Sequence, residues 1–374
     1  MQPSYRIGFA IEHTLGHVTF ANTLRRLVDA DPSIHASWHL VQPETMAWPA
    51  TVRPFSRNGT LQASITARRL VGLAPQLDVL MMHTQTLMLL FARLLRRVPG
   101  VLSTDATPKN IDDVGQGYWH FPGNPVAEEV KRRLTGASIR RASVAMPWNN
   151  WAMRSLTGDY GMPAQRCRVL HPGLDVTQWS VAAHEGDGPV RFLFVGGQFQ
   201  RKGGGRLLEA LARLAAEGVD YECDVVTKED VPRLPGVRCH TGLGPGDERL
   251  GRFYRDAHVF VLPTKGDAMP WAVLEAMAAG LPVVSTRLGA IPELVDGRTG
   301  LLVEPDDVDS LVRALRELAL DPGRRRRMGL AGRERVVEDY NEAVNGPRVI
   351  ELLKATADDG RRRRAGTASG PGPH

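Results

Sequence analysis

Short apolar runs rich in β-branched residues alternate with longer helical patterns along most of this chain. This alternation is typical of βαβ units, in which helices connect parallel strands. A first series predicts strands at 5–11, 37–41, 78–82, 100–103, 143–146 and 168–170. A second series predicts strands at 190–195, 222–226, 237–240, 258–262, 282–285 and 300–303. The pattern therefore predicts an α/β protein with two doubly wound parallel sheets.

A polar segment with glycine and proline, AHEGDGP at 183–189, separates the two series. At 374 residues the chain also exceeds what one hydrophobic core usually organises. We therefore expect an N-terminal domain at 1–184 and a C-terminal domain at 188–340. Doubly wound sheets bind ligands at the carboxyl ends of their strands, so the expected site is a cleft in which two such sheets face each other.

The formal net charge of +6 permits an anionic ligand or surface. Arginine runs at 324–327 and 361–364 contribute to it, and we interpret them as solvated charge rather than contact with nucleic acid or membrane. The second run opens a segment rich in glycine, proline and serine, so we expect a disordered tail at 360–374. The apolar stretch 79–95 contains polar residues and predicts a buried strand and helix rather than a membrane span. Three cysteines without a C-x-x-C pair, and no secretory signal, favour a cytoplasmic protein.

A glycine-rich segment, GGQFQRKGGG, follows the strand expected at 190–195 and precedes a helical pattern. Gly196 and Gly197 allow close backbone approach, and Arg201 and Lys202 add two cations beside a helix N-terminus, which suits a phosphate. A tight turn with surface charges explains the same residues equally well. Because the segment is neither G-x-G-x-x-G nor a P-loop, hydride transfer and nucleotide hydrolysis lose their main support.

The segment 258–307 carries a second group of candidate residues. Asp267 lies on a loop, and Glu275 follows eight positions later in a helix that begins near Pro270. A helical carboxylate can accept hydrogen bonds from two ribose hydroxyls, and one on the preceding loop can reach a sugar. Glu275 stands among apolar residues, so we expect it to be buried and to need partners. The other donor-binding candidates of this segment are Ala268, Met269, Pro270, Trp271 and Leu274.

The same segment resembles the signature of the retaining family-4 glycosyltransferases. The resemblance rests on LEAMA at 274–278, Gly280, PVV at 282–284, Gly289, Glu293 and GLLV at 300–303. HPGLD at 171–175 resembles a further family element, P-x-G-V-D. The N-terminal half matches more weakly, through Gly16-His17 and the segment 78–83.

The resemblance implies the GT-B fold, two Rossmann-like domains with the final helix, 341–358, crossing back onto the first. It also implies retaining transfer of a sugar from a nucleoside-diphosphate sugar, most often UDP-linked, to an acceptor hydroxyl, without a metal or other cofactor. Polysaccharide and natural-product acceptors both fit. No nucleic-acid partner and no transmembrane segment are expected, while peripheral membrane contact stays open. Arg201, Lys202 and Asp267 would be catalytic.

This chain departs from the family at one place. Asp267 stands where glutamate is usual, and Ala268-Met269-Pro270 replaces a Gly-Phe-Gly run. Aspartate is shorter by about 1.5 Å and proline lacks an N–H donor. A catalytically silent nucleotide-binding or partner subunit is therefore the alternative, although the retained Arg201, Lys202 and Glu275 favour an enzyme.

The N-terminal half offers weaker candidates. His83 lies where family members often place a histidine near the donor sugar, which makes it a catalytic candidate, and Gly16 would let the donor approach the backbone. His13 and His17 flank Gly16 and are candidates for acceptor binding, as well as for an ordinary structural role. The last acceptor-binding candidates follow the strand expected at 100–103 and serve equally well as turn residues: Asp105, Thr107 and Lys109.

Overall fold

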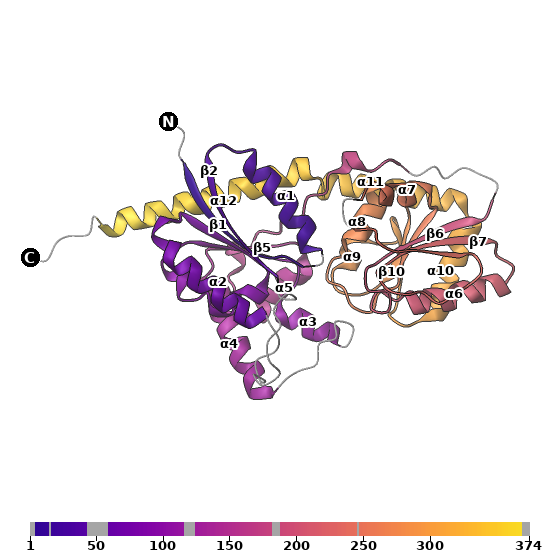
Figure 1. The fold of residues 1–374 in the computed structure, drawn as a ribbon, viewed down its shortest axis with the longest axis horizontal. Helices are drawn as coiled ribbons and strands as arrows, with labels where there is room; N and C mark the ends of the chain where they lie inside the picture. Colours follow the sequence, from indigo (N-terminus) through magenta and orange to yellow (C-terminus); the bar gives the residue numbers. More distant parts are fainter. Residues whose placement is uncertain are drawn as a thin grey trace, which may run out of the picture. The chain divides into compact units, whose positions relative to one another are not determined.

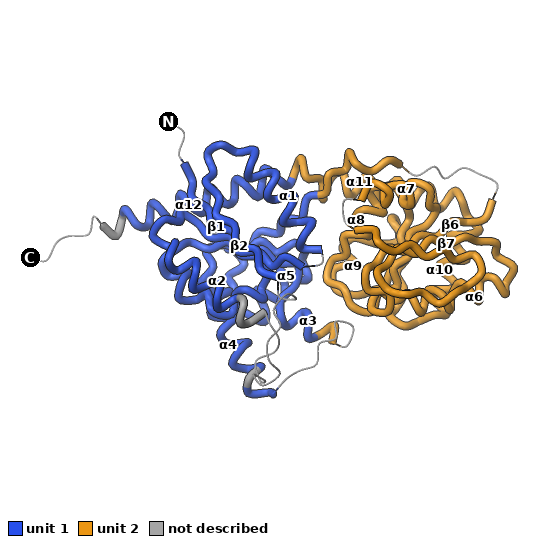
Figure 2. Tube along the Cα trace, viewed as in Figure 1, with its two compact units in different colours: residues 1–112, 121–173, 345–374 blue, residues 113–120, 174–344 orange. Residues whose placement is uncertain are grey.

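The protein is described by a computed structural model in which residues 4–14, 16–42, 59–115, 124–181, 188–244 and 247–368 are placed (Figure 1). The chain divides into two compact units (Figure 2). The N-terminal unit comprises Met1–Asp112, Phe121–Gly173 and Asn345–His374, and the C-terminal unit comprises Asp113–His120 and Leu174–Val344. The division thus falls after Gly173, ahead of the polar segment 183–189, most of which lies outside the described residues.

The N-terminal unit is built on a five-stranded parallel sheet with the order β2-β1-β3-β4-β5. Its strands are β1 (Tyr5–Glu12), β2 (Ile34–Val41), β3 (Val79–His83), β4 (Gly100–Thr104) and β5 (Val144–Pro147). Its helices are α1 (His17–Asp29), α2 (Gly59–Leu73), α3 (Pro108–Val114), α4 (Pro125–Arg141), α5 (Asn150–Gly158) and α12 (Glu342–Ala368).

The sixth strand expected here, at 168–170, is not formed. The backbone N–H groups of Arg168 and Leu170 donate to carbonyls of β5, but the pairing reduces to one isolated bridge between Ala145 and Cys167. Pro172 follows at once and has no N–H to continue a ladder. An apolar run of three residues was therefore too weak a signal for a strand.

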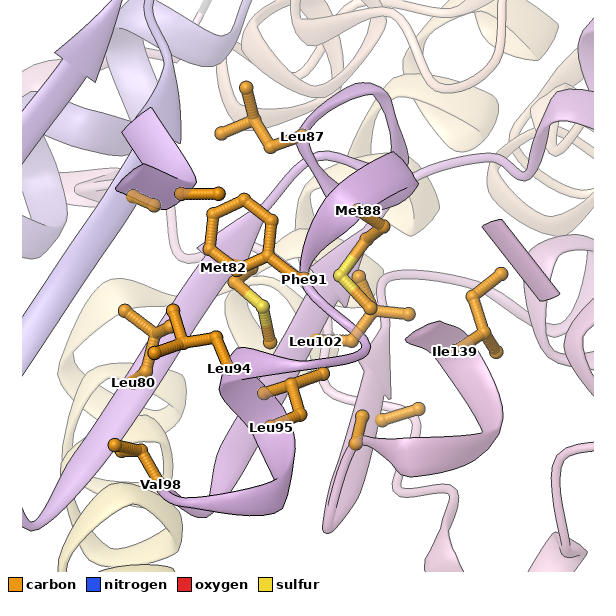
Figure 3. Close-up of a cluster of buried hydrophobic side chains, with 14 of the residues drawn as sticks. Leu80, Met82, Leu87, Met88, Phe91, Leu94, Leu95, Val98, Leu102 and Ile139 are labelled. Atoms are coloured by element: carbon orange, nitrogen blue, oxygen red, sulfur yellow. The ribbon is translucent and has the colours of Figure 1, made fainter. Parts of the chain in front are cut away.

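The core of the N-terminal unit lies between β3, β4 and the segment that follows β3. Met82, Phe91 and Leu102 are fully buried in it, and Figure 3 shows them in one cluster. The stretch 79–95 is largely buried, with Leu90 and Arg93 exposed. After its strand it forms two short 3-10 helices, η3 (Gln85–Leu90) and η4 (Leu94–Arg96), instead of an α-helix. These turns bring the chain back to β4 along a compact path.

Helix α12 packs on the N-terminal unit and extends further than expected. Arg361 pairs with the buried carboxylate of Asp78 at 2.8 Å and lies over the ring of Tyr5, while Lys354 pairs with Asp31 at 2.6 Å. These contacts keep residues 360–368 helical, so the disordered tail expected at 360–374 was wrong for that part. Residues 369–374 lie outside the described residues.

The arginine runs are not purely solvated charge. Arg361 is engaged as above, and the buried Arg325 donates to the carbonyls of Leu318 and Ala319 at the end of a neighbouring helix. A cation at a helix C-terminus interacts favourably with the helix dipole. Both arginines therefore hold helices in place.

The C-terminal unit contains a six-stranded parallel sheet with the order β11-β10-β9-β6-β7-β8. Its strands are β6 (Val190–Val195), β7 (Tyr221–Val226), β8 (Val237–His240), β9 (Val259–Leu262), β10 (Val283–Thr286) and β11 (Gly300–Val303). Its helices are α6 (Gly204–Ala216), α7 (Glu248–Asp256), α8 (Trp271–Ala278), α9 (Ile291–Leu294), α10 (Val308–Leu320) and α11 (Pro322–Asp339). All six strands expected from the second series are confirmed.

The strand order of this sheet reverses beside β6. The chain leaves β6 towards β7 on one side and returns to β9 on the other, with Phe192 paired to Val259. In doubly wound sheets ligands bind at this point, outside the carboxyl ends of the strands. The loops after β6 and β9 therefore form the edge to inspect for a site. Within the described parts of the chain, no helix has the length and apolar character needed to cross a membrane.

Candidate functional site

Glycines let the loops after β6 and β9 touch. Gly203 has a φ of 82°, and a Cβ atom there would lie 1.8 Å from the carbonyl oxygen of Pro263. Gly204, the first residue of α6, lies against the ring of Phe199, where a Cβ would lie 2.1 Å from a ring carbon. The N–H of Gly204 donates to the carbonyl of Phe199 at 2.8 Å. Because Gly203 offers no side chain to cap α6, the next N–H groups of the first turn keep their capacity to bind an anion.

Lys202 and Asp267 form an ion pair across these two loops. Their side chains are only 14% and 9% exposed. Gly196 lies beneath the lysine, since a Cβ there would come within 2.9 Å of Lys202 Cγ. Burial lowers the pKa of Lys202, and the charge of Asp267 opposes that shift. The pair is thus a charged couple held where little water reaches it.

Arg201 lies beside this pair. It is buried, its Nε donates to the side-chain oxygen of Gln198, and its Nη1 donates to the carbonyl of Gly266 on the β9 loop. The structure therefore brings together three predicted residues, Arg201, Lys202 and Asp267. Gly197 faces another cation: a Cβ there would lie 3.7 Å from the side chain of Lys228.

Gly289 packs against the loop after β9, which carries Asp267. With a φ of 56°, this residue approaches so closely that a Cβ would lie 2.5 Å from the carbonyl oxygen of Asp267. The backbone N–H of Ala290 donates to the carbonyl of Ala268 at 2.9 Å. The predicted residues Ala268, Met269 and Trp271 are buried around the start of α8, whose N-cap is Pro270.

Glu275 projects from α8 and is partly rather than fully buried. Its Oε2 accepts a hydrogen bond of 2.7 Å from the hydroxyl of Tyr254 on α7. Burial raises the pKa of Glu275, and this hydrogen bond works against the rise. Leu274, next to it, is fully buried, so its side chain packs in the core instead of lining a site.

In the N-terminal unit the structure joins two predicted histidines. His83, at the end of β3, is fully buried, and its ring stacks on Trp148 at 4.8 Å between centroids. Its Nδ1 lies 3.2 Å from the carbonyl oxygen of Ser103, and its Nε2 lies 3.0 Å from Nδ1 of His17. The hydroxyl of Ser103, which can donate or accept, lies 3.1 Å from the same Nδ1, so these contacts fit either tautomer of His83. Between Nε2 of His83 and Nδ1 of His17, one nitrogen donates and the other accepts. Burial holds the pKa of His83 well below its ordinary value, which keeps the ring neutral.

His17 is more exposed than His83 and begins α1, directly after Gly16, the N-cap of that helix. The side chain of His83 is fully buried and has no surface exposed to a ligand, and its Nε2 contacts His17. His13, by contrast, lies on the exposed side of the same loop, 3.4 Å from the amide of Gln42.

The acceptor-binding candidates after β4 are largely engaged within the fold. Thr107 is fully buried, and its hydroxyl lies 2.6 Å from that of Ser155. This interaction corrects the expectation that Thr107 binds an acceptor. The backbone carbonyl of Asp105 accepts from Asn149 at 2.9 Å, and the backbone N–H of Lys109 donates to Tyr160. Both contacts are made by the backbone of these residues. Residues 116–119 of the same segment lie outside the described residues.

Two residues of these sites were missed from the sequence. Tyr254 and Lys228 reach Glu275 and Gly197 from α7 and from the loop after β7. No local motif carries such contacts. Among the described residues, no group of three or more histidine, cysteine or acidic side chains is placed to hold a metal ion.

This chain is similar to known proteins both in sequence and in fold. The family model of the group 1 glycosyl transferases matches residues 189–321. The MMP α-(1→4)-mannosyltransferase of Mycolicibacterium hassiacum is 38% identical over 169 residues, which are 42% of this chain and 41% of that protein. The α-maltose-1-phosphate synthase of Mycolicibacterium smegmatis is 28% identical over 90% of this chain and 94% of its own length.

A solved structure extends the likeness of fold over nearly the whole chain. The Anabaena protein HepE, in complex with UDP-glucose, has a TM-score of 0.68 and 13% identity and covers 94% of this chain and 99% of its own. Two Rossmann-like domains with C-terminal helices define the GT-B class of proteins. The match of residues 189–321 to the group 1 glycosyl transferases agrees with the resemblance seen in the sequence of this chain.

Proposed function

We propose that this protein is a retaining glycosyltransferase that moves a sugar from a nucleoside-diphosphate sugar, UDP-linked in the first instance, to an acceptor hydroxyl. Its product would be a polysaccharide or a natural-product glycoside, and no metal would take part. The observation that carries the proposal is the Lys202–Asp267 pair beside Arg201, at the point where the strand order of the C-terminal sheet reverses. Glu275 completes the donor site from α8.

The ion pair suggests how the donor would engage. A diphosphate carries more negative charge than a carboxylate, so it is the stronger partner for the ammonium of Lys202. On donor binding we expect Lys202 to leave Asp267 for the diphosphate. The freed carboxylate of Asp267 then accepts hydrogen bonds from hydroxyls of the transferred sugar, as the resemblance to the family implies.

The same groups would stabilise the leaving group. As the bond between the anomeric carbon and the phosphate oxygen breaks, negative charge grows on the diphosphate. Arg201, Lys202 and the N–H groups that follow Gly204 in the first turn of α6 are positioned before the reaction, which is the arrangement that lowers such barriers most. The acceptor oxygen bonds to the anomeric carbon on the face that the diphosphate leaves, and its proton passes to a diphosphate oxygen. No further base is required.

The choice of UDP rests on the frequency of this nucleotide in the family that the sequence resembles, and the HepE structure in complex with UDP-glucose supports it. The mannosyl and maltosyl relatives differ from one another in product, so they leave the acceptor open.

The test is calorimetry and thermal shift against UDP, GDP, ADP and TDP without added metal, because a ligand that binds the native state raises its melting temperature. We expect saturable binding of one nucleotide, strongly weakened in Glu275→Ala. A matched control is Glu217→Ala, an exposed carboxylate that pairs with Arg316 at the far end of α6. If no nucleoside diphosphate binds, the proposal fails. If a nucleotide binds but no sugar is transferred to any acceptor, the silent partner subunit is the better description.

A further inference from the structure

Tyr254 lies behind the proposed ribose-binding carboxylate. Its side chain is completely buried, and its hydroxyl donates a 2.7 Å hydrogen bond to Oε2 of Glu275. The two residues come from different helices, α7 and α8, so the contact is made by the fold and not by a local turn. A buried hydroxyl and a partly buried carboxylate each need a partner, and each supplies the other's.

The ring of Tyr254 is fixed from two sides. The ring of Trp179 meets it edge-on at 5.0 Å, and the ring of Phe260 stacks on it at 5.9 Å. Trp179 is itself held, because its backbone carbonyl accepts a hydrogen bond of 3.0 Å from Arg333. The hydroxyl therefore points at Glu275 with little rotational freedom.

The hydrogen bond has two consequences for Glu275. It occupies one of the two carboxylate oxygens, and it stabilises the ionised form that burial disfavours. An ionised carboxylate with one oxygen engaged is a strong acceptor with a defined direction. Oε1 is then the oxygen best placed to receive a ribose hydroxyl.

We propose that Tyr254 is a positioning residue for nucleotide recognition: it orients Glu275 so that one carboxylate oxygen reads the ribose hydroxyls of a nucleoside diphosphate. The inference rests on the proposed function and deepens its donor site. It makes ribose recognition depend on a side chain that touches no ligand, and it separates this step from the charge stabilisation supplied by Arg201 and Lys202.

The test compares wild type with Tyr254→Phe, which keeps the ring between Trp179 and Phe260 and removes only the hydroxyl. Tyr221→Phe is the control, since that buried tyrosine, at the start of β7, donates to the carbonyl of Pro235. Calorimetry measures the affinity for UDP and GDP and for their 2′-deoxy and 3′-deoxy forms. We expect Tyr254→Phe to weaken the ribose nucleotides roughly three- to tenfold, the effect of one hydrogen bond. The deoxy form that lacks the recognised hydroxyl should be weakened much less.

A purely structural role would weaken every ligand equally, and that result would overturn the inference, as would unchanged affinities throughout. The pH profile of binding gives a second readout. Removing the donor raises the pKa of Glu275, so the loss of ribose nucleotide affinity on acidification should begin at a higher pH in Tyr254→Phe. If the wild type binds no nucleoside diphosphate, the proposed function fails with it; if the wild type binds and Tyr254→Phe behaves like Tyr221→Phe, only this inference fails.

Discussion

The two units hold their candidate residues in different ways. In the C-terminal unit, Gly203 and Gly289 bring backbones into contact, and charged side chains from neighbouring loops pair directly. In the N-terminal unit, His83 and Thr107 are buried, and their polar atoms bind other parts of the same unit. Charged candidate residues therefore pair across loops in the C-terminal unit, whereas in the N-terminal unit His17 is more exposed than His83. The donor chemistry that we propose is concentrated in the C-terminal unit.

The largest effect is expected from removing the cations of the C-terminal edge. Arg201→Ala combined with Lys202→Ala should lower turnover on the order of 10²–10³-fold, the usual cost of losing preorganised stabilisation of a developing anion. Affinity for the free nucleotide should fall less. Steady-state rates beside calorimetric affinities check this. A drop in affinity as large as the drop in rate would place these residues in binding alone.

The next effect concerns the close approach that builds this edge. Gly203→Ala should destabilise the protein by about 3 kcal/mol, because the new Cβ would clash with the carbonyl of Pro263 and strain a left-handed backbone. Gly218→Ala is the matched control: Gly218 has a φ of 80°, but no atom lies within 4 Å of the new Cβ. Denaturant unfolding measures the loss of stability in both variants, and the difference between them is the cost of the clash. Equal losses would show that the clash does not contribute.

A smaller effect tests how the N-terminal unit is closed. Asp78→Asn should cost about 2 kcal/mol, since it breaks a charged hydrogen bond with Arg361 in a buried place. Asp31→Asn removes the carboxylate that pairs with Lys354. Because Asp31 is more exposed than Asp78, this change should lower the free energy of unfolding by less than about 1 kcal/mol. Thermal unfolding compares the two, and a larger loss in Asp31→Asn would contradict the ranking.

The same pair predicts a pH dependence. Burial raises the pKa of Asp78, but the hydrogen bonds from Arg361 and from the backbone of Arg6 outweigh it, so the folded value lies below the ordinary one. The stabilisation is therefore complete above about pH 4, the ordinary value for aspartate, and is lost as the pH falls through the lower folded value. The free energies of unfolding of wild type and Asp78→Asn should converge as the pH falls. If their difference stays constant down to the lowest pH, the Asp78–Arg361 pair is not the cause of the pH dependence.

The smallest effect concerns the histidines. His17→Ala should lower turnover about tenfold, as expected for the loss of one hydrogen bond to substrate, and should leave nucleotide affinity unchanged. The exposed His35 on β2 provides the control His35→Ala. Loss of nucleotide affinity in His17→Ala would show that the N-terminal unit also takes part in nucleotide binding.

The sequence predicted the C-terminal sheet strand by strand. It also singled out Lys202, Asp267 and Glu275 as candidate donor-site residues, because they follow apolar strands or lie within a helix at a fixed spacing. It did not predict Tyr254, whose contact with Glu275 spans 21 residues and depends on how two helices pack. Helix α12 was cut short for a similar reason. Its composition favours disorder, and contacts with residues distant in sequence, among them Asp78, 283 residues away, explain why Arg361 is ordered.

That last contact also bears on how the chain is assembled. Arg361 is synthesised after the whole C-terminal unit, yet it neutralises a carboxylate directly before the third strand of the N-terminal sheet. During translation the first half of the protein therefore emerges with Asp78 bonded to Arg6 but without its partner on α12. The N-terminal unit is synthesised first, but its structure is completed last. A nascent chain that ends before α12 therefore leaves this unit incomplete and exposed to chaperones and proteases.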